Sequence, residues 1–348
     1  MLNRQRWTLK MHSAMISAIA SVLALCFLPI CHAQNGAYTF VSFDAPSAGT
    51  GPGQGTYPTA INRIGWIGGY VYNSAGSPRG FLRTRGGRFI EVNPPTSVSS
   101  VVNAINVAPQ AVGTFLDRNR DSHGFLFEVG GFYTQLDAPG ATSTYPLSIN
   151  DAGQVVGAES DATGTHAFLW TAQNQFTVFD APGVGSGGTW ATAINASGQA
   201  TGYYFDASSE VHAWFRTATG HIITFDVGNG SGTKAFAINR GGEIAGSWND
   251  GNGSQYGFAR NTDGTFDLFS ISGGNSNVVT SINDNGAFVG YNFSDFESTS
   301  FEGDPSGNVA KIPLPFANTL NTAVGINAKG HITGLYKDSN AAAHGWAK

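Results

Sequence analysis

The chain has 348 residues, with 18 Lys or Arg and 23 Asp or Glu, and its formal net charge is −5 at pH 7. This weakly acidic balance argues against nucleic acid or an anionic membrane as a binding partner. The two cysteines, Cys26 and Cys31, both lie near the N-terminus, so no disulfide is expected to hold the rest of the chain together.

Residues 1–33 have the features of a secretory signal peptide. A basic start precedes an uncharged stretch over residues 14–30, and Ala33 supplies a small residue before the expected cut. The mature chain is therefore predicted to begin at Gln34 and to be secreted, with no cysteine and no membrane contact after cleavage. The alternative is an uncleaved anchor, although a stretch broken by Pro29 is at the short limit for a membrane span.

One phrase then recurs along the chain. It is Ile-Asn, with a Gly three residues after the Asn and a second Gly seven residues after it. Successive Ile positions are 44 or 45 residues apart. A fixed period of this size indicates a solenoid, a propeller or another array of repeats. The repeats begin near Ile61, Ile105, Ile149, Ile194, Ile238, Ile282 and Ile326.

The phrase predicts a type I turn that the Asn side chain caps, followed by a crowded strand. Asn at the first turn position and Gly at the fourth suit that turn. The second Gly is kept in every repeat, which predicts close backbone approach or a bulge inside a strand. The residue before each Ile is always small, and we attribute this to crowding by the neighbouring repeat. The strand glycines are Gly69, Gly113, Gly157, Gly202, Gly246, Gly290 and Gly334.

The fold predicted from this pattern is all-β. Each repeat reads as four short strands separated by Gly, Pro, Asn and Asp. The repeats begin with a lone fourth strand near residues 38–46 and end, at Lys348, after a third strand. A closed ring explains these complementary ends, whereas a β-helix would carry atypical caps. We therefore predict one domain over residues 34–348, a seven-bladed β-propeller whose N-terminal strand completes the last blade.

The repeats resemble a known family. Ile-Asn-x-x-Gly, the second Gly, His-Ala/Gly-Phe/Trp and Phe-Asp-Ala-Pro-Gly together are similar to the bacterial HAF-repeat family of predicted extracellular proteins. His166-Ala167-Phe168 is the triplet that gives the family its name. The resemblance covers about residues 38–348 and is weakest in the sixth repeat. It implies an extracellular β-repeat protein and brings no established activity or catalytic residue.

Recurring His and Asp residues have structural interpretations. One His per blade places these rings around the circumference, too far apart to share one metal ion, so no metal site is expected. A recurring Asp after the second strand is a preferred turn residue. Asp117-Arg118-Asn119-Arg120-Asp121, with Glu128 at the twelfth place, half-matches a calcium loop, but Ser122 replaces its glycine. Calcium binding there is left open.

The favoured function is secreted, non-catalytic binding of an extracellular glycan or protein surface by a monomer. The alternatives are a polysaccharide-active lyase or hydrolase on the same face, and a structural surface or matrix protein. No nucleophile motif, paired carboxylates or phosphate loop emerges from the sequence, so no catalytic residue and no cofactor is predicted.

We expect the site on the face that holds the longer, variable loops, which join fourth to first and second to third strands. Aromatic rings near the start of the innermost strands would combine there with polar loop residues, as in ligand pockets. The alternative is that the rings are only packing inside the blades. The candidate ligand-binding residues are Tyr57, Tyr145, Trp190, Asp117, Arg118, Asp161 and Asp206.

Overall fold

The computed structural model describes residues 39–228, 232–270, 276–294, 297–315 and 320–348. Within these ranges the chain forms strands and turns and contains no helix. It follows that no described helix is long and apolar enough to span a lipid bilayer. The predicted signal peptide and the cleavage before Gln34 lie outside the described residues. The unit described below is Phe40–Lys348.

The strands repeat in a fixed order along this unit. The first strands are β2 (Gly55–Ile61), β6 (Ser99–Ile105), β10 (Ser143–Ile149), β14 (Val184–Ile194), β18 (Lys234–Ile238), β22 (Ser276–Ile282) and β26 (Asn321–Ile326). The second strands are β3 (Ile67–Tyr72), β7 (Ala111–Leu116), β11 (Val155–Ser160), β15 (Ala200–Asp206), β19 (Ile244–Asn249), β23 (Phe288–Ser294) and β27 (Ile332–Lys337).

The outer strands follow in the same way. The third strands are β4 (Pro78–Arg83), β8 (Ser122–Glu128), β12 (Thr165–Thr171), β16 (Val211–Arg216), β20 (Gln255–Arg260), β24 (Glu297–Gly303) and β28 (Ala343–Ala347). The fourth strands are β5 (Phe89–Val92), β9 (Phe132–Leu136), β13 (Gln175–Phe179), β17 (Ile222–Phe225), β21 (Phe266–Phe269) and β25 (Val309–Lys311). At the start of the unit, β1 (Val41–Phe43) pairs antiparallel with β28.

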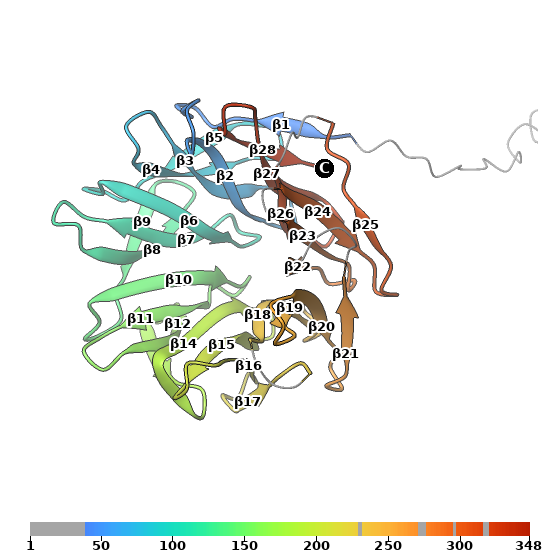
Figure 1. Ribbon diagram of the computed structural model, residues 1–348. Helices are drawn as coiled ribbons and strands as arrows, with labels where there is room; N and C mark the ends of the chain where they lie inside the picture. The colour runs from blue at the N-terminus through green and yellow to red at the C-terminus, as the bar shows by residue number, and fades with distance from the viewer. Residues whose placement is uncertain (1–38, 229–231, 271–275, 295–296, 316–319) are drawn as a thin grey trace, which may run out of the picture. The chain divides into compact units, whose positions relative to one another are not determined.

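The strands of one repeat pair antiparallel in chain order, as in β10-β11-β12-β13, and the sheets lie around a common centre (Figure 1). The described strands group into three sheets of four and two of eight, rather than one sheet per repeat. The larger sheets arise because a first strand also pairs with the third strand of the repeat before it. A single parallel pair makes each junction, Gly55 with Ala343 and Gln255 with Ser276.

The Asn of each Ile-Asn pair has two roles. Its Oδ1 accepts backbone N–H groups of its own turn, as when Asn62 Oδ1 lies 2.9 Å from Trp66 N, which confirms the capped turn. Its Nδ2 donates to the backbone carbonyl of the next repeat's Asn, at 2.8–3.2 Å. Asn327 returns the bond to Asn62 at 2.9 Å, so these hydrogen bonds form a closed circuit. All of these Asn side chains are buried.

The hydrophobic core lies mainly between consecutive repeats. Leu82 and Val92, on β4 and β5, pack in one cluster with Val102 and Phe125, on β6 and β8. No single repeat covers its own apolar face, which is why strands this short are stable only when the repeats stack.

The strand glycines confirm the predicted crowding and show its cause. An ideal Cβ on Gly157 would lie 2.0 Å from the carbonyl oxygen of Tyr145, on the neighbouring strand of the same sheet. The register between β10 and β11 shifts just after that point, between Pro146 and Ser148, so the glycine accommodates a bulge. The small residue before each Ile has a different neighbour, because a Cβ on Gly325 would meet Ile61 of the adjacent repeat.

Candidate functional site

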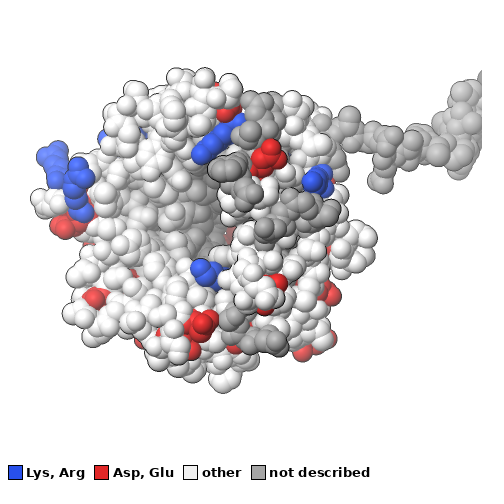
Figure 2. All heavy atoms as spheres, in the orientation of Figure 1, with Lys and Arg blue, Asp and Glu red and all other residues white. Residues whose placement is uncertain are grey.

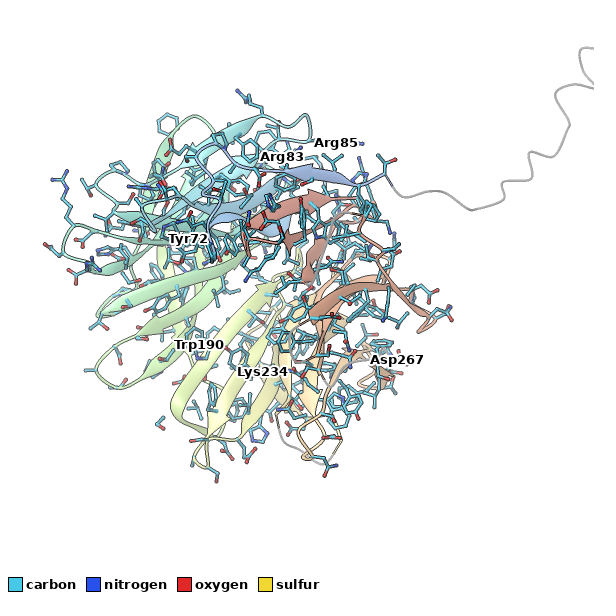
Figure 3. The ribbon with its side chains drawn as sticks, turned by 45° about the horizontal axis from the view of Figure 1, so that its top comes forward. Tyr72, Arg83, Arg85, Trp190, Lys234 and Asp267 are labelled. Carbon is cyan, nitrogen blue, oxygen red and sulfur yellow. The ribbon has the colours of Figure 1, made fainter. Side chains whose placement is uncertain are left out.

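Two of the predicted aromatic residues lie together. Tyr145 on β10 and Trp190 on β14 have ring centroids 6.3 Å apart. Tyr203 on β15 also stacks on Trp190, with ring centroids 6.3 Å apart and planes at 12°. Lys234 on β18 places its Nζ 5.1 Å from the centroid of the Tyr203 ring. We call Tyr145, Trp190, Tyr203 and Lys234 the aromatic group; Figure 3 labels Trp190 and Lys234.

The half-exposed state of these residues follows from the alternation of a strand. Thr189 and Ala191, on either side of Trp190, are completely buried between sheets, so Trp190 points to the opposite side of β14. All four members of the aromatic group are partly exposed. Burial raises the pKa of Tyr203, so its phenol stays a neutral hydrogen-bonding group. The group thus combines three accessible rings with one ammonium.

Tyr57 belongs to a separate cluster. Its ring stacks on Tyr70 of β3, with centroids 5.1 Å apart and planes at 3°, and Tyr72 approaches edge-on at 5.7 Å. The Tyr57 hydroxyl donates to the carbonyl of Gly53 at 2.9 Å. Burial raises the pKa of Tyr70 to about 12, with Tyr72 and Tyr57 adding to the shift. The structure therefore does not bring Tyr57 into the aromatic group.

The repeats surround a central cavity, and the Ile-Asn turns form one mouth of it. This mouth lies at the ends of the first strands, whereas Tyr145, Trp190 and Lys234 come four residues earlier on those strands. Ile, Asn and the residue that follows them line it, from Ile61 to Ala328. Arg63 and Asp284 form an ion pair across this mouth, with Nη2 and Oδ2 3.1 Å apart. Asp284 also accepts the backbone N–H of Arg240 at 3.1 Å. The turns are uniform and the charged side chains here pair with one another, so we interpret this end as structural and not as the binding site. Figure 2 shows one face of the molecule, hollowed at its centre, with Lys or Arg side chains above and below the hollow.

The predicted loop acids cap turns and also contact histidines. Asp117, Asp161 and Asp206 each accept backbone N–H groups two to four residues ahead, as expected for turn residues. An oxygen of each lies 3.5–4.0 Å from the Nε2 of the His that starts the third strand. Arg118 is exposed. None of these residues belongs to the aromatic group.

The calcium-loop pattern is not matched by its geometry. Asp117 Oδ1 is occupied by the N–H groups of Asn119 and Asp121. Glu128, at the twelfth place, lies at the far end of β8 and accepts a hydrogen bond from Gln110 at 2.7 Å. A strand seven residues long separates the two parts, so they cannot enclose one ion.

Sequence reasoning missed the second partner of each His. Nδ1 pairs with an Asp fourteen residues away, at 2.9 Å for His123–Asp137, 2.7 Å for His166–Asp180 and 2.9 Å for His212–Asp226. His344 makes the same pair with Asp44, at 2.9 Å. The signal was the Asp that recurs just after the strand paired with the third strand, which stands in Phe-Asp-Ala-Pro at Asp44 and Asp180 and in variants of it at Asp137 and Asp226.

One of these His residues has an unusual cross-strand neighbour. Phe115, Tyr204 and Tyr336 lie opposite His123, His212 and His344, with ring centroids 4.9–5.2 Å apart. Glu159 takes that place opposite His166. Glu159 is only 3 % exposed, and burial raises its pKa, with the charges of Asp161 and Asp180 adding to the rise and His166 opposing it. Thr163 hydrogen bonds lower the pKa of Asp161.

Comparisons with known proteins show the fold. No family model matches the chain, and no curated protein matches its sequence. Among solved structures, a streptogramin B lyase is 14% identical over 89% of this chain and 97% of its own, with a TM-score of 0.58. The virginiamycin B lyase from Staphylococcus aureus, 12% identical, covers 89% and 99% with a TM-score of 0.58.

A third solved structure is the β-propeller domain of the Trilobed protease from Pyrococcus furiosus, which has an open velcro topology. It is 10% identical, covers 84% of this chain and 95% of its own, and has a TM-score of 0.56. At these identities the likeness concerns architecture alone. The chain therefore has a fold of the β-propeller type, and its function has to be argued from its own residues.

Proposed function

We propose that this chain is a secreted, monomeric binding protein whose aromatic group takes an extracellular glycan. The scaffold of the proposal is a ring of seven four-stranded blades closed by β1. Three observations support that ring: the closed circuit of Asn hydrogen bonds, the contact of β26 with β2, and the pairing of β1 with β28. Secretion rests on the signal-like start, and the extracellular setting on the resemblance of the repeats to the HAF family.

The stacked rings of the aromatic group carry the proposal. Tyr145, Trp190 and Tyr203 come from three strands of two repeats, so the sheets hold them in place at little cost in conformational freedom. Rigid aromatic surface with a few polar groups is typical of ligand sites, and it suits the flat apolar face of a sugar ring. Lys234 adds a hydrogen-bond donor for hydroxyl or carboxylate oxygens.

Binding without catalysis is favoured because the acid–base pairs lie elsewhere. The His–Asp pairs of the second, third and fourth repeats join the third strand to the end of the fourth, and His344 pairs with Asp44, just after β1. The aromatic group lies instead on first and second strands. Lyases share the fold, but the likeness at 12–14% identity carries no residue over to this chain.

The test is a glycan array with the purified chain, followed by titration of the best ligand into variants. Trp190→Ala and Tyr145→Ala should each weaken binding by about tenfold or more, as removal of a central aromatic anchor does. Phe132→Ala is the matched control, because Phe132 is an aromatic on the outer strand β9 and is 71 % exposed. Unchanged affinity in both test variants, with their folding verified, would place the site elsewhere. Turnover of the bound sugar would favour the lyase or hydrolase alternative.

A further inference from the structure

We propose that Glu159, Asp161 and His166 bind a divalent transition-metal ion, such as Zn²⁺, at the β11–β12 hairpin. Each side chain offers one ligand atom, and these atoms lie within 4.8 Å of one another. Within the described part of the chain, this is the one group of three such residues with that geometry. One imidazole nitrogen with two carboxylate oxygens suits Zn²⁺ and similar ions. The site is independent of the aromatic group and of the glycan proposal.

The buried carboxylate of Glu159 is the first observation that points to a cation. Glu159 is 3 % exposed, and its Oε2 has no hydrogen-bond partner. A buried carboxylate without a partner is unfavourable unless it is neutralised by a proton or paired with a positive charge. Asp180, which follows β13 and pairs with His166, also has a buried oxygen without a hydrogen-bond partner, Oδ1. Several acidic oxygens thus converge where the protein supplies one imidazole.

The orientation of His166 is the second observation. Its Nδ1 lies 2.7 Å from Asp180 Oδ2, so the neutral ring donates from Nδ1 and keeps a lone pair on Nε2. A carboxylate behind the imidazole in this way orients metal-binding histidines and raises their basicity. Nε2 and Asp161 Oδ1 are 3.5 Å apart. Two ligands about 2.1 Å from one tetrahedral ion are separated by about 3.4 Å, close to this distance.

Thr163 occupies part of the space between these groups. Its hydroxyl donates to Asp161 Oδ1 at 2.6 Å and lies 2.9 Å from His166 Nε2. A hydroxyl has one proton, so while it donates to Asp161 it leaves the Nε2 lone pair of a neutral ring unmatched. A metal ion would use the lone pair, the Asp161 oxygen and the free Glu159 oxygen together. Three protein ligands leave a position for water or an oxygen of a bound molecule.

Comparison of the repeats shows that Glu159 is what sets this hairpin apart. The second, fourth and seventh repeats have the same Asp–His–Asp arrangement, but Phe115, Tyr204 or Tyr336 stacks on the His. There the His has two carboxylate neighbours and an aromatic cover. No metal site was expected because the recurring His residues belong to different repeats. The third repeat instead offers three ligands within one hairpin.

The experiment measures Zn²⁺ binding to the untagged, metal-stripped chain by calorimetry and by metal content after dialysis. Wild type should bind one Zn²⁺ per chain, and its melting temperature should rise with Zn²⁺ concentration. Glu159→Gln keeps the size of the side chain and should lower the affinity at least tenfold. Glu159→Phe recreates the arrangement of the second repeat and should fold normally while losing both the binding and the thermal shift.

His212→Gln is the matched control, because His212 has the same two Asp neighbours without the Glu. This variant should still bind one Zn²⁺ with unchanged affinity. The proposal is overturned if wild type binds no Zn²⁺ at micromolar concentration, if Glu159→Gln binds as wild type does, or if His212→Gln loses binding equally. These readouts do not depend on any glycan, so the two proposals can fail separately.

Discussion

At the scale of single residues, the strand glycines allow the first strand to bulge toward its partner. In each repeat, a Cβ at that glycine would lie 1.8–2.3 Å from a first-strand carbonyl oxygen. No real Cβ tolerates that distance, and the clashing atom is backbone, which cannot turn away as a side chain can. Glycine therefore recurs here because there is no space for a Cβ, and not because the backbone needs the conformational freedom of glycine.

Gly157→Ala tests this directly. The added methyl would lie 2.0 Å from Tyr145 O and 3.0 Å from the Phe168 ring, so the bulge has to shift. We expect a loss of at least about 2 kcal/mol in the free energy of unfolding, measured by denaturant titration. Gly86→Ala is the control, because its nearest neighbour is 4.0 Å away, and it should change stability by less than about 0.5 kcal/mol. If the two variants had the same free energy of unfolding, the crowding argument would be contradicted.

A second residue-scale prediction concerns pH. Burial by itself lowers the pKa of His212, but the hydrogen bond and charge of Asp226, with those of Asp206, raise it above its usual value. A raised pKa in the folded state means that the protonated ring stabilises the fold at low pH. That contribution is complete below the unfolded pKa of about 6.5 and is lost as pH rises through the higher folded value.

His212→Gln should therefore destabilise the protein more at pH 5.5 than at pH 8.5, in unfolding titrations run beside wild type. The stacked Tyr204 remains in both proteins, so the comparison isolates the ionic part of the pair. A difference in stability that stays constant across this range would show that the imidazolium contributes nothing.

At the scale of elements, the Ile-Asn turn connects the first and second strands of its repeat and also links that repeat to the next. Asn195 Oδ1 accepts the backbone N–H groups of Ser197 and Gln199, each at 3.0 Å. Its Nδ2 donates to the Asn239 carbonyl at 3.0 Å and to Gln199 Oε1 at 2.8 Å. The residue is 4 % exposed, so a lost donor leaves these oxygens unsatisfied in the interior.

Asn195→Asp separates the two roles, because a carboxylate keeps the turn acceptor and removes the donor. We expect a loss of about 2–4 kcal/mol in unfolding free energy at pH 7, since a buried negative charge then lies against two oxygens. Asp304→Asn is the opposite exchange in an exposed turn, where Oδ1 accepts Ser306 N and Asn308 N. It should change stability by less than about 0.5 kcal/mol. Similar losses in the two variants would mean that the link between repeats adds nothing.

The elements also show what a sequence pattern can and cannot predict. The period, the capped turn and the crowded glycines follow from local rules, because each involves residues within one repeat or its flanking strand. The donor of Asn195, the Asp226 partner of His212 and the place of Glu159 opposite His166 depend on register and on contact between sheets. Asp226 and its equivalents recur just after a strand, as in the Phe-Asp-Ala-Pro motif, but nothing in these short sequences names a partner fourteen residues earlier.

The candidate binding site was predicted in part for the same reason. Tyr145 and Trp190 were both candidates because they hold equivalent positions at the start of innermost strands, and in consecutive repeats their rings lie 6.3 Å apart. Tyr203 was not combined with them because it lies on a second strand. Lys234 holds the position of Trp190 in the next repeat, but it is not aromatic and was left out of the candidate site. Tyr57 shares the position of Trp190 and likewise stacks on its cross-strand partner, Tyr70. The repeats on either side of it carry Val101 and Thr322 at that position, so equivalent positions do not ensure a common site.

At the scale of the whole molecule, the question is what holds the ends of the repeat unit together. β1 pairs with β28, with Val41 opposite Ala347 and Phe43 opposite Gly345. The Phe43 ring lies where a side chain on Gly345 would be, and it also packs with Phe81 and Ile67 of the first repeat. Asp44 accepts a hydrogen bond from His344 at 2.9 Å. These contacts join the start of the unit to its last and first repeats at once.

Removal of residues 34–46 from the predicted mature chain is the test of closure. The change uncovers Gly345 and Trp346 and leaves β28 with an unpaired edge, which is a template for association with other chains. Loss of the buried Phe43 ring alone costs about 3–5 kcal/mol, so we expect the melting temperature to fall by about 10 °C and the chain to aggregate. A peptide of residues 38–48 added in trans should restore part of that loss, because it can occupy the vacated place beside β28.

Val41→Thr is the control for a substitution in β1 that keeps the strand. Val41 is 47 % exposed, so this variant should have the melting temperature of wild type. The Asn circuit and the contact of β26 with β2 remain in the shortened chain, so they alone would join the first and last repeats if β1 were dispensable. A monomeric shortened chain that melts with wild type would therefore assign closure to the inner strands and leave β1 as an accessory.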